Sequence, residues 1–220
     1  MRKTAFLFFL LVFSFPCFSA RKAELSDTIS VRRAFMELSS AEMDLLSKDR
    51  RFEMLIYFDN DSIHKAPNNL GGRSYIEQLA PGFISVKLSD SSSLQIEVLP
   101  TVSGSEIVMT VHTVGDDVRS ADSEIAFYDS SLKPIATAKL FSTPSLTDFM
   151  NPSQKKRIKE AEMLLPFMNI VYESKADGTT LIARLSYKDI VSMEDARRLD
   201  ELLIPTVSYI WNEKKYIKNK

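Results

Sequence analysis

Along the first half of the chain, the spacing of apolar residues changes from helical to strand-like. From Val31 to Phe58 they recur every three or four residues, which predicts two helices over roughly 41–47 and 49–58. From Phe83 onward, alternating apolar and polar residues form short runs separated by turn residues, as in "FISVKLSD", "SLQIEVLP", "SEIVMTVHTVG" and "SEIAFYDSSLKPIAT". This period of two predicts an antiparallel meander.

The second half repeats the order of helix and hairpin. A helix is predicted over 154–165, and Asp177-Gly178 marks the turn of a hairpin. A further helix over 192–203 has Ser192 as its predicted N-cap, and a closing strand, a turn and a short return follow it. The two halves match only loosely, so an internal duplication and a coincidence both stay open.

These patterns predict an α+β fold in which helices pack on antiparallel β-sheet. The apolar faces predict a core made of Phe35, Leu55, Ile56, Ile84, Val86, Leu94, Ile96, Ile107, Met109, Ile125, Phe127, Ile170, Val171, Leu181, Ile182 and Trp211. The predicted organisation is a signal peptide (1–19), a disordered N-terminal segment (20–30), a helix-plus-sheet half (31–141), a connector (142–153) and a helix-plus-hairpin half (154–220).

The first twenty residues, "MRKTAFLFFLLVFSFPCFSA", have the layout of a secretory signal. Arg2 and Lys3 precede an apolar run that is shorter than the roughly 20 residues of a membrane-spanning helix. Cleavage after Ser19 fits the preference for small residues better than cleavage after Ala20. We therefore expect export to the periplasm or cell envelope. A lipoprotein anchored through Cys17 is the alternative, although the residues before that cysteine match a lipidation signal poorly.

Composition and charge narrow the classes of function. The chain is 45% hydrophobic and 26% charged, which is typical of a globular protein. Removing the signal takes away Arg2 and Lys3, so 26 basic residues face 29 acidic ones and the net charge changes from −1 to −3. That balance does not favour nucleic acid as a partner. Cys17 is the sole cysteine, so the mature chain depends on a hydrophobic core, and no later stretch predicts a transmembrane segment.

The stretch "NNLGGRSYI" (68–76) raises the question of a phosphate-binding loop. Dinucleotide and phosphate loops need G-x-G-x-x-G or G-x-x-x-x-G-K-[ST] between a strand and a helix, and neither spacing is present. No strand is predicted before Gly71. We therefore interpret the stretch as a turn in which Gly71 or Gly72 takes a positive φ, next to Asn68 and Asn69.

Two other stretches hold residues that could carry chemistry. "DNDSIH" offers Asp59, Asp61 and His64, but it lacks the glycine and the final glutamate of a calcium loop, which favours a solvated helix end. The tail "NEKKYIKNK" could contact acidic lipid or polysaccharide, or could simply be a solvated chain end.

His112 lies within a predicted strand, with Asp116 and Asp117 shortly after it. The mature chain has no cysteine nucleophile, no serine in a G-x-S-x-G elbow, and only two histidines. The sequence therefore predicts no catalytic, cofactor-binding or metal-binding residue.

Several segments carry a family resemblance: "RRAFMELSSAEMDLLSKDRRFEMLIYF", "NNLGGRSYIEQLAPGFISVKLSDSSSLQIEVLP", "SEIVMTVHTVG" and "SEIAFYDSSLKPI". Over Val31 to Ile135, and more loosely beyond, the chain resembles a family of exported Bacteroidetes proteins catalogued as domain of unknown function 3256. Family members usually have a proline at Ser39 or Ser40 and a tryptophan near Leu132, where this chain departs. The resemblance implies export and a mixed fold, and it brings no active-site residues.

The sequence favours a non-catalytic binding or interaction module of the cell envelope, with an envelope protein or a glycan as its partner. The alternative is an envelope hydrolase that uses carboxylates among Asp59, Asp61, Asp116 and Asp117. Antiparallel sheets with an open face or edge commonly serve recognition, which supports the first hypothesis.

Mass spectrometry of the mature protein tests the export prediction. We expect a free amino terminus at Ala20, or at Arg21 if the second cleavage site is used. A lipid-modified Cys17 at the amino terminus would contradict this prediction and would support the membrane-anchored lipoprotein.

Overall fold

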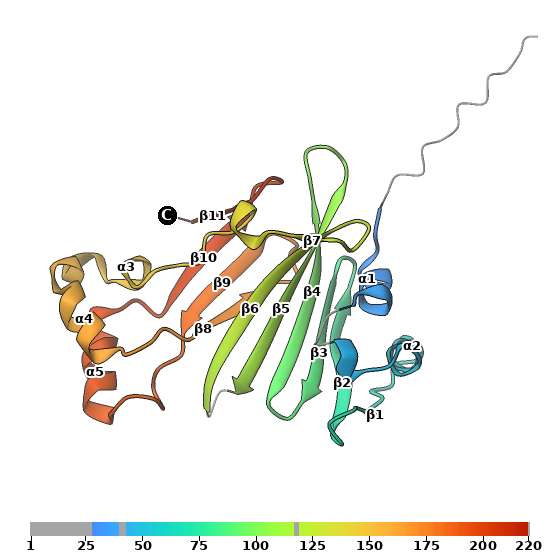
Figure 1. Cartoon of the computed structure of the whole chain (residues 1–220), viewed down its shortest axis with the longest axis horizontal. Helices are drawn as coiled ribbons and strands as arrows, with labels where there is room; N and C mark the ends of the chain where they lie inside the picture. Colours follow the sequence, from blue (N-terminus) through green and yellow to red (C-terminus); the bar gives the residue numbers. More distant parts are fainter. Residues whose placement is uncertain (1–27, 40–42, 117–118, 220) are drawn as a thin grey trace, which may run out of the picture.

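The computed structural model describes residues 28–39, 43–116 and 119–219. Within them the fold is mixed α+β, with one seven-stranded and one four-stranded antiparallel sheet (Figure 1). No helix in these ranges combines the length and the apolarity needed to cross a membrane.

The seven-stranded sheet is a meander in which every strand pairs with its neighbour in the chain. Its strands are β1 (Ala66–Pro67), β2 (Arg73–Ala80), β3 (Phe83–Ser89), β4 (Ser92–Pro100), β5 (Glu106–Asp116), β6 (Arg119–Asp129) and β7 (Pro134–Ile135). The two-residue strands β1 and β7 leave most of β2 and β6 as the outer edges.

The four-stranded sheet has the order β11-β10-β9-β8. Its strands are β8 (Ile170–Ser174), β9 (Thr180–Leu185), β10 (Thr206–Trp211) and β11 (Tyr216–Lys218). The helical elements are α1 (Val31–Glu37), η1 (Met43–Leu45), α2 (Lys48–Asp59), η2 (Thr137–Lys139), α3 (Leu146–Phe149), η3 (Pro152–Arg157), α4 (Ile158–Leu164) and α5 (Met193–Leu202).

Two buried clusters form the core. One contains Phe35 of α1 and Met54 of α2 together with Ile84 and Ile96 of the large sheet. The other joins Phe127 of the large sheet to the four-stranded sheet, α4 and α5. In Figure 1, α1 and α2 lie on one side of the large sheet and the four-stranded sheet on the other.

Aromatic side chains fill the second cluster. The ring of Phe141 meets those of Tyr172, Tyr209 and Tyr216 edge-on, at centroid distances of 5.5, 5.1 and 6.1 Å. The Trp211 indole N–H donates to the carbonyl of Pro100 over 2.6 Å, so its polar atom is satisfied inside an apolar cluster.

The predicted helix over 49–58 is confirmed by α2, but the one over 41–47 is wrong. Only the short 3₁₀ turn η1 forms there among the described residues, since 40–42 lie outside them. Ser47 has a non-helical backbone, with φ −59° and ψ 156°, and its hydroxyl accepts from the Arg50 N–H over 3.3 Å. It is therefore the N-cap of α2, and a helix cannot continue through it. The earlier helix, α1, starts at Val31 because Ser30 caps it.

The predicted meander strands and the C-terminal hairpin are confirmed. Gly178 takes φ +77° at the predicted turn, and Glu213 takes φ +63° between β10 and β11. The expectation that no strand precedes Gly71 is wrong, because β1 does so and pairs with β2, itself not predicted. Within the predicted connector, Ser145 and Asp148 form the capping box of α3.

Most of the predicted core is buried, and the exceptions have a geometric cause. Ile56 lies on the outer face of α2 and is 45% exposed, so its assignment is wrong. Val171 and Ile182 are only half-buried because successive strand residues face opposite ways. Their neighbours Ile170 and Leu181 occupy the inward positions. Ile107, the second residue of β5, is half-buried as well and packs against the second cluster.

The glycine pair lies in the turn between β1 and β2, as the turn interpretation expects. Gly71 takes φ +80°, and the Asn68 N–H donates to the Gly72 carbonyl over 3.0 Å. The buried Asn68 side chain accepts from the N–H groups of Leu70 and Gly72 and donates to the Leu88 carbonyl. Its oxygen therefore serves backbone donors that a phosphate would otherwise need.

Replacement of Gly71 by Ala tests this turn. We expect Gly71→Ala to lower the free energy of unfolding by about 1–2 kcal/mol, because a Cβ is strained at positive φ. The matched control is Gly72→Ala, whose added Cβ makes only ordinary contact with Asn68 at 3.4 Å. Denaturant unfolding measures both variants. Equal losses, or ATP binding abolished by either change in calorimetry, would contradict the turn interpretation.

Candidate functional site between the two sheets

The outer edge of β8 lies against the face of the large sheet, and side chains of that sheet bind it. The N–H groups of Ile170, Tyr172 and Ser174 donate to Asp122 Oδ1, Ser123 Oγ and Gln95 Oε1 over 2.8, 3.1 and 2.9 Å. Alternate residues of a strand direct their N–H groups to the same edge. The unpaired edge of the small sheet is thus satisfied by side chains and not by another strand.

The edge of β6 also finds acceptors, which come from the segment that follows β9. The Ala121 N–H donates to Ser186 Oγ over 3.1 Å, and the Ser120 hydroxyl donates to Asp189 Oδ1 over 2.9 Å. The Ser120 N–H also donates to Asp189. The large sheet therefore contributes side chains to the edge of β8, and the segment between β9 and α5 contributes side chains to the edge of β6. We call this set of bonds the sheet junction.

Glu97 of β4 is the one acidic residue that is fully buried at the junction, with 0% of its surface exposed among the described residues. The Ser174 hydroxyl donates to Glu97 Oε2. Glu97 Oε1 and the Tyr216 hydroxyl are both buried, and neither makes a hydrogen bond of ordinary geometry in the described structure. The two groups still interact with each other, and the Tyr216 hydroxyl lowers the pKa of Glu97. Burial raises the pKa of Glu97 to about 7, against the opposing effect of the Ser174 bond.

A raised carboxyl pKa can mark a general acid, but the burial of Glu97 argues against that role here. A catalytic acid must come within hydrogen-bond distance of its substrate. Glu97 has no exposed surface through which a substrate could reach it. Burial, followed by the negative charge of Glu97, also raises the pKa of Tyr216. The pair is best understood as a structural element of the junction.

A polar cavity of about 280 Å³ opens next to the junction, and we call it the intersheet cavity. Lys87, Ser93, Gln95 and Thr113 of the large sheet line it, and Arg184 of β9 lines the side formed by the small sheet. Hydroxyl, amide and cationic groups therefore dominate the part of its lining that comes from these strands.

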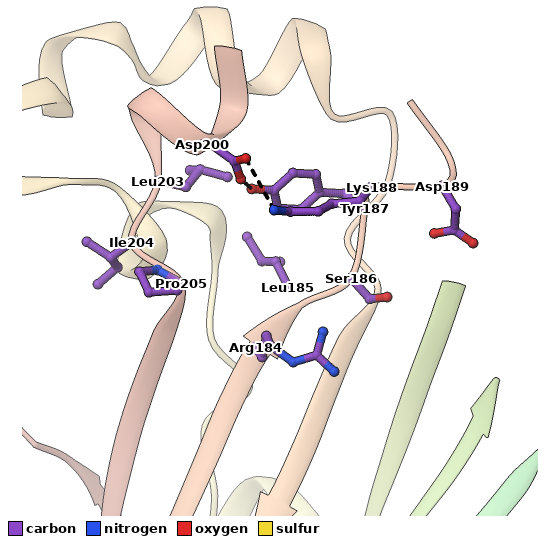
Figure 2. Close-up of a pocket in the computed structure, with 10 residues that line it drawn as sticks. All are labelled: Arg184, Leu185, Ser186, Tyr187, Lys188, Asp189, Asp200, Leu203, Ile204 and Pro205. Atoms are coloured by element: carbon purple, nitrogen blue, oxygen red, sulfur yellow. Dashed lines mark hydrogen bonds and ion pairs between the residues drawn. The ribbon is translucent and has the colours of Figure 1, made fainter. Parts of the chain in front are cut away.

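A second cavity, of about 520 Å³, lies between the end of β9, α5 and the start of β10, and we call it the α5 cavity (Figure 2). The Tyr187 hydroxyl donates to Asp200 Oδ1 over 2.6 Å, and Lys188 Nζ lies 3.2 Å from Asp200 Oδ2. The Tyr187 bond holds the pKa of Asp200 below its ordinary value, and burial raises that of Tyr187. Arg184 lines this cavity as well as the intersheet cavity.

The residues that the sequence singled out lie elsewhere. Arg32 Nη1 donates to Asp59 Oδ2 over 3.0 Å at the end of α2, which lowers the pKa of Asp59. Asp61 follows at φ +52° in an exposed turn. The His64 ring stacks on Tyr57 at 4.3 Å.

The second group of candidates is divided between β5 and the turn that follows it. His112 is half-buried in β5, and Asp116 ends that strand, whereas Asp117 lies outside the described residues. Across the described ranges, no three His, Cys, Asp or Glu side chains gather where they could hold a metal ion.

Sequence reasoning missed Glu97, Gln95 and Arg184. Alternation in "SLQIEVLP" places Leu94, Ile96 and Val98 on one face of the strand, and it predicts no role for Gln95 and Glu97 between them. No local signal showed that β8 would cover the face of these two residues, because its bond to Gln95 spans 79 residues of sequence.

The comparison with family models gives the class of this protein. The model described as "Protein of unknown function (DUF3256)" matches residues 26–216, so the chain belongs to that family and the resemblance seen in the sequence is confirmed. The chain is also similar to a solved domain of an uncharacterized protein from Porphyromonas gingivalis W83. The TM-score is 0.70 at 20% identity, over 86% of this chain and 96% of that one, which shows a shared fold. No curated protein matches the chain.

The pH dependence of stability tests the state of Glu97. Its pKa is raised in the fold from 4.5 to about 7, so the folded chain binds this proton more tightly. Its contribution to the free energy of unfolding is complete below pH 4.5 and is lost as the pH rises to about 7, by roughly 3 kcal/mol. Glu97→Gln should remove this loss and make the variant more stable than the wild type at pH 8.

Denaturant unfolding between pH 4 and 8 measures this difference. Glu173→Gln is the control, since Glu173 is exposed on β8 and should leave the profile unchanged. A Glu97→Gln profile parallel to that of the wild type would show that Glu97 titrates normally.

Proposed function

We propose that this protein is an exported, non-catalytic binding protein of the periplasm or cell envelope, which holds an envelope glycan or protein segment at the junction of its two sheets. The observation that carries the proposal is that Arg184 lines both the intersheet cavity and the α5 cavity. One ligand could therefore contact both cavities through a single cation.

The α5 cavity has the features of a binding site. Its volume of about 520 Å³ lies within the roughly 300–1,000 Å³ typical of small-molecule sites. Leu185, Leu203, Ile204 and Pro205 supply apolar surface, and a few polar groups are fixed at its edge. Such a combination supplies apolar contact for affinity and fixed polar groups for orientation.

The polar groups of the α5 cavity suit recognition better than proton transfer. One oxygen of Asp200 accepts a hydrogen bond from Tyr187, and the other forms an ion pair with Lys188. The pKa of Asp200 is lowered. Asp200 is therefore ionised at neutral pH and has no proton to donate. The pKa of Tyr187 is raised, so the phenol keeps its proton and cannot serve as a base.

Export rests on the signal layout of the first nineteen residues and on the family resemblance. The proposal also takes α1 and α2 as helices packed on the large sheet, since they share a buried cluster with its strands. That arrangement leaves the opposite face, with the sheet junction, for the ligand. The carboxylate hydrolase has no such support, because Asp59 is paired with Arg32 and lines neither cavity.

Affinity capture from an envelope extract, together with a glycan and peptide binding panel, tests the proposal on the mature chain. We expect a stoichiometric ligand whose affinity falls about tenfold or more in Arg184→Gln, because a charge-assisted hydrogen bond is lost. Arg33→Gln is the matched control, since Arg33 is an exposed α1 residue paired with Glu37.

Thermal midpoints of both variants separate lost binding from lost folding. Binding that survives Arg184→Gln in a folded variant would place the ligand elsewhere. Turnover of a panel substrate that disappears with Asp116→Asn would favour the hydrolase.

A further inference from the structure

We propose that the intersheet cavity binds a small hydroxylated anion, of the class formed by uronic acids and sugar phosphates, with Lys87 and Arg184 as its cationic contacts. This inference rests on the proposed binding function and names the chemistry of one of its two cavities.

The register of the large sheet places a row of polar residues across four strands. Lys87 pairs with Ser93, Ser93 with Thr113, and Thr113 with Ser123. Residues directly opposite each other in a sheet point to the same face, and neighbouring strands lie about 4.8 Å apart. Lys87, Ser93 and Thr113 of this row line the cavity, and Ser123 continues the row beyond it.

The two ends of the row differ in whether their side chains make hydrogen bonds within the fold. Ser123 Oγ accepts from the Tyr172 N–H over 3.1 Å and lies 2.8 Å from Thr113 Oγ1. The side chains of Lys87 and Ser93 make no hydrogen bond or ion pair within the described part of the chain, although both are half-buried. Because Lys87 is only half-buried, its ammonium group keeps contact with water and can meet an anion in the cavity.

Gln95 extends the set of free donors. Its side-chain oxygen accepts from the Ser174 N–H, which fixes the orientation of the amide. The amide nitrogen makes no further bond within the described residues, so its two N–H groups are available to a ligand. Ammonium, hydroxyl and amide donors at this spacing suit a ligand that carries both a charge and several oxygen atoms.

The electrostatics of the cavity favour an anion. Among the described residues, Lys87 and Arg184 are the cations that line it, and Glu173 is the acidic residue. Glu173 forms an ion pair with Lys175, so its charge is already compensated. Lys87 makes no ion pair within the described residues, so its ammonium group is the charge that a carboxylate or a phosphate monoester complements.

The size of the cavity limits the ligand to about one ring. Its volume of about 280 Å³ lies just below the usual range of roughly 300–1,000 Å³ for small-molecule sites. A nucleotide phosphate would need a glycine-rich loop or a helix N-terminus, and the lining comes from strands and their connections. An acidic sugar unit is the class that fits both the size and the donors.

Isothermal titration of the mature chain with galacturonate, glucose 6-phosphate and neutral methyl galactoside tests the inference. We expect at least one of the two anions to bind about tenfold more tightly than the neutral sugar, with an affinity that falls as salt rises. The anion that binds identifies a carboxylate or a phosphate as the recognised group.

Variants then locate the site. Lys87→Gln should weaken anion binding about tenfold, and Lys87→Arg should retain most of it because the charge stays. Lys133→Gln, at an exposed turn after β6, is the matched control and should bind like the wild type. Equal binding of neutral and acidic sugars, or full affinity in folded Lys87→Gln, would overturn the inference.

The two proposals fail in distinguishable ways. If neither anion binds while envelope capture still depends on Arg184, the ligand class is wrong and the binding function stands. If capture and titration both show no binding, the proposed function fails together with this inference.

Discussion

The structure depends on how the free edge of β8 is satisfied where it meets the large sheet. A strand edge exposes N–H groups that must find acceptors when it is covered. Here Asp122, Ser123 and Gln95 supply those acceptors from two strands of the large sheet, and these bonds fix where β8 crosses the sheet. The intersheet cavity is bounded by the strands joined in this way, so its shape follows from the same bonds.

The buried Glu97 makes that junction sensitive to protons. As a carboxylate it lies in a low-dielectric surrounding, which is why burial raises its pKa. The Ser174 and Tyr216 hydroxyls act in the opposite direction, because a donor beside the carboxylate favours its ionised form. These three side chains join β4, β8 and β11. The folded chain holds the proton of Glu97 more tightly than the unfolded chain does, so the stability of the junction falls as the pH rises toward 7.

The parts of the fold that local chemistry decides could be predicted from the sequence. Alternation identified β3 to β6, and Asp177-Gly178 identified the hairpin turn. The strand β2 escaped because its register shifts between Ile76 and Gln78, and a bulge breaks the period of two on which strand prediction relies. The sheet junction could not be predicted for another reason. Its contacts join residues 48 to 79 positions apart, and no local pattern encodes such a pairing.

The backbone of the junction requires hydrogen-bond acceptors and does not require particular residues. An edge N–H group needs an acceptor, and aspartate, serine and glutamine all meet that need here, so the junction can tolerate exchange among such residues. Lys87 and Ser93 differ from these acceptors because they bind nothing in the described fold. A residue at either position can change without loss of the junction, so a cation at Lys87 is not required by the architecture. Its place in the lining of the intersheet cavity, beside Arg184, is the reason why we propose that it contacts a ligand.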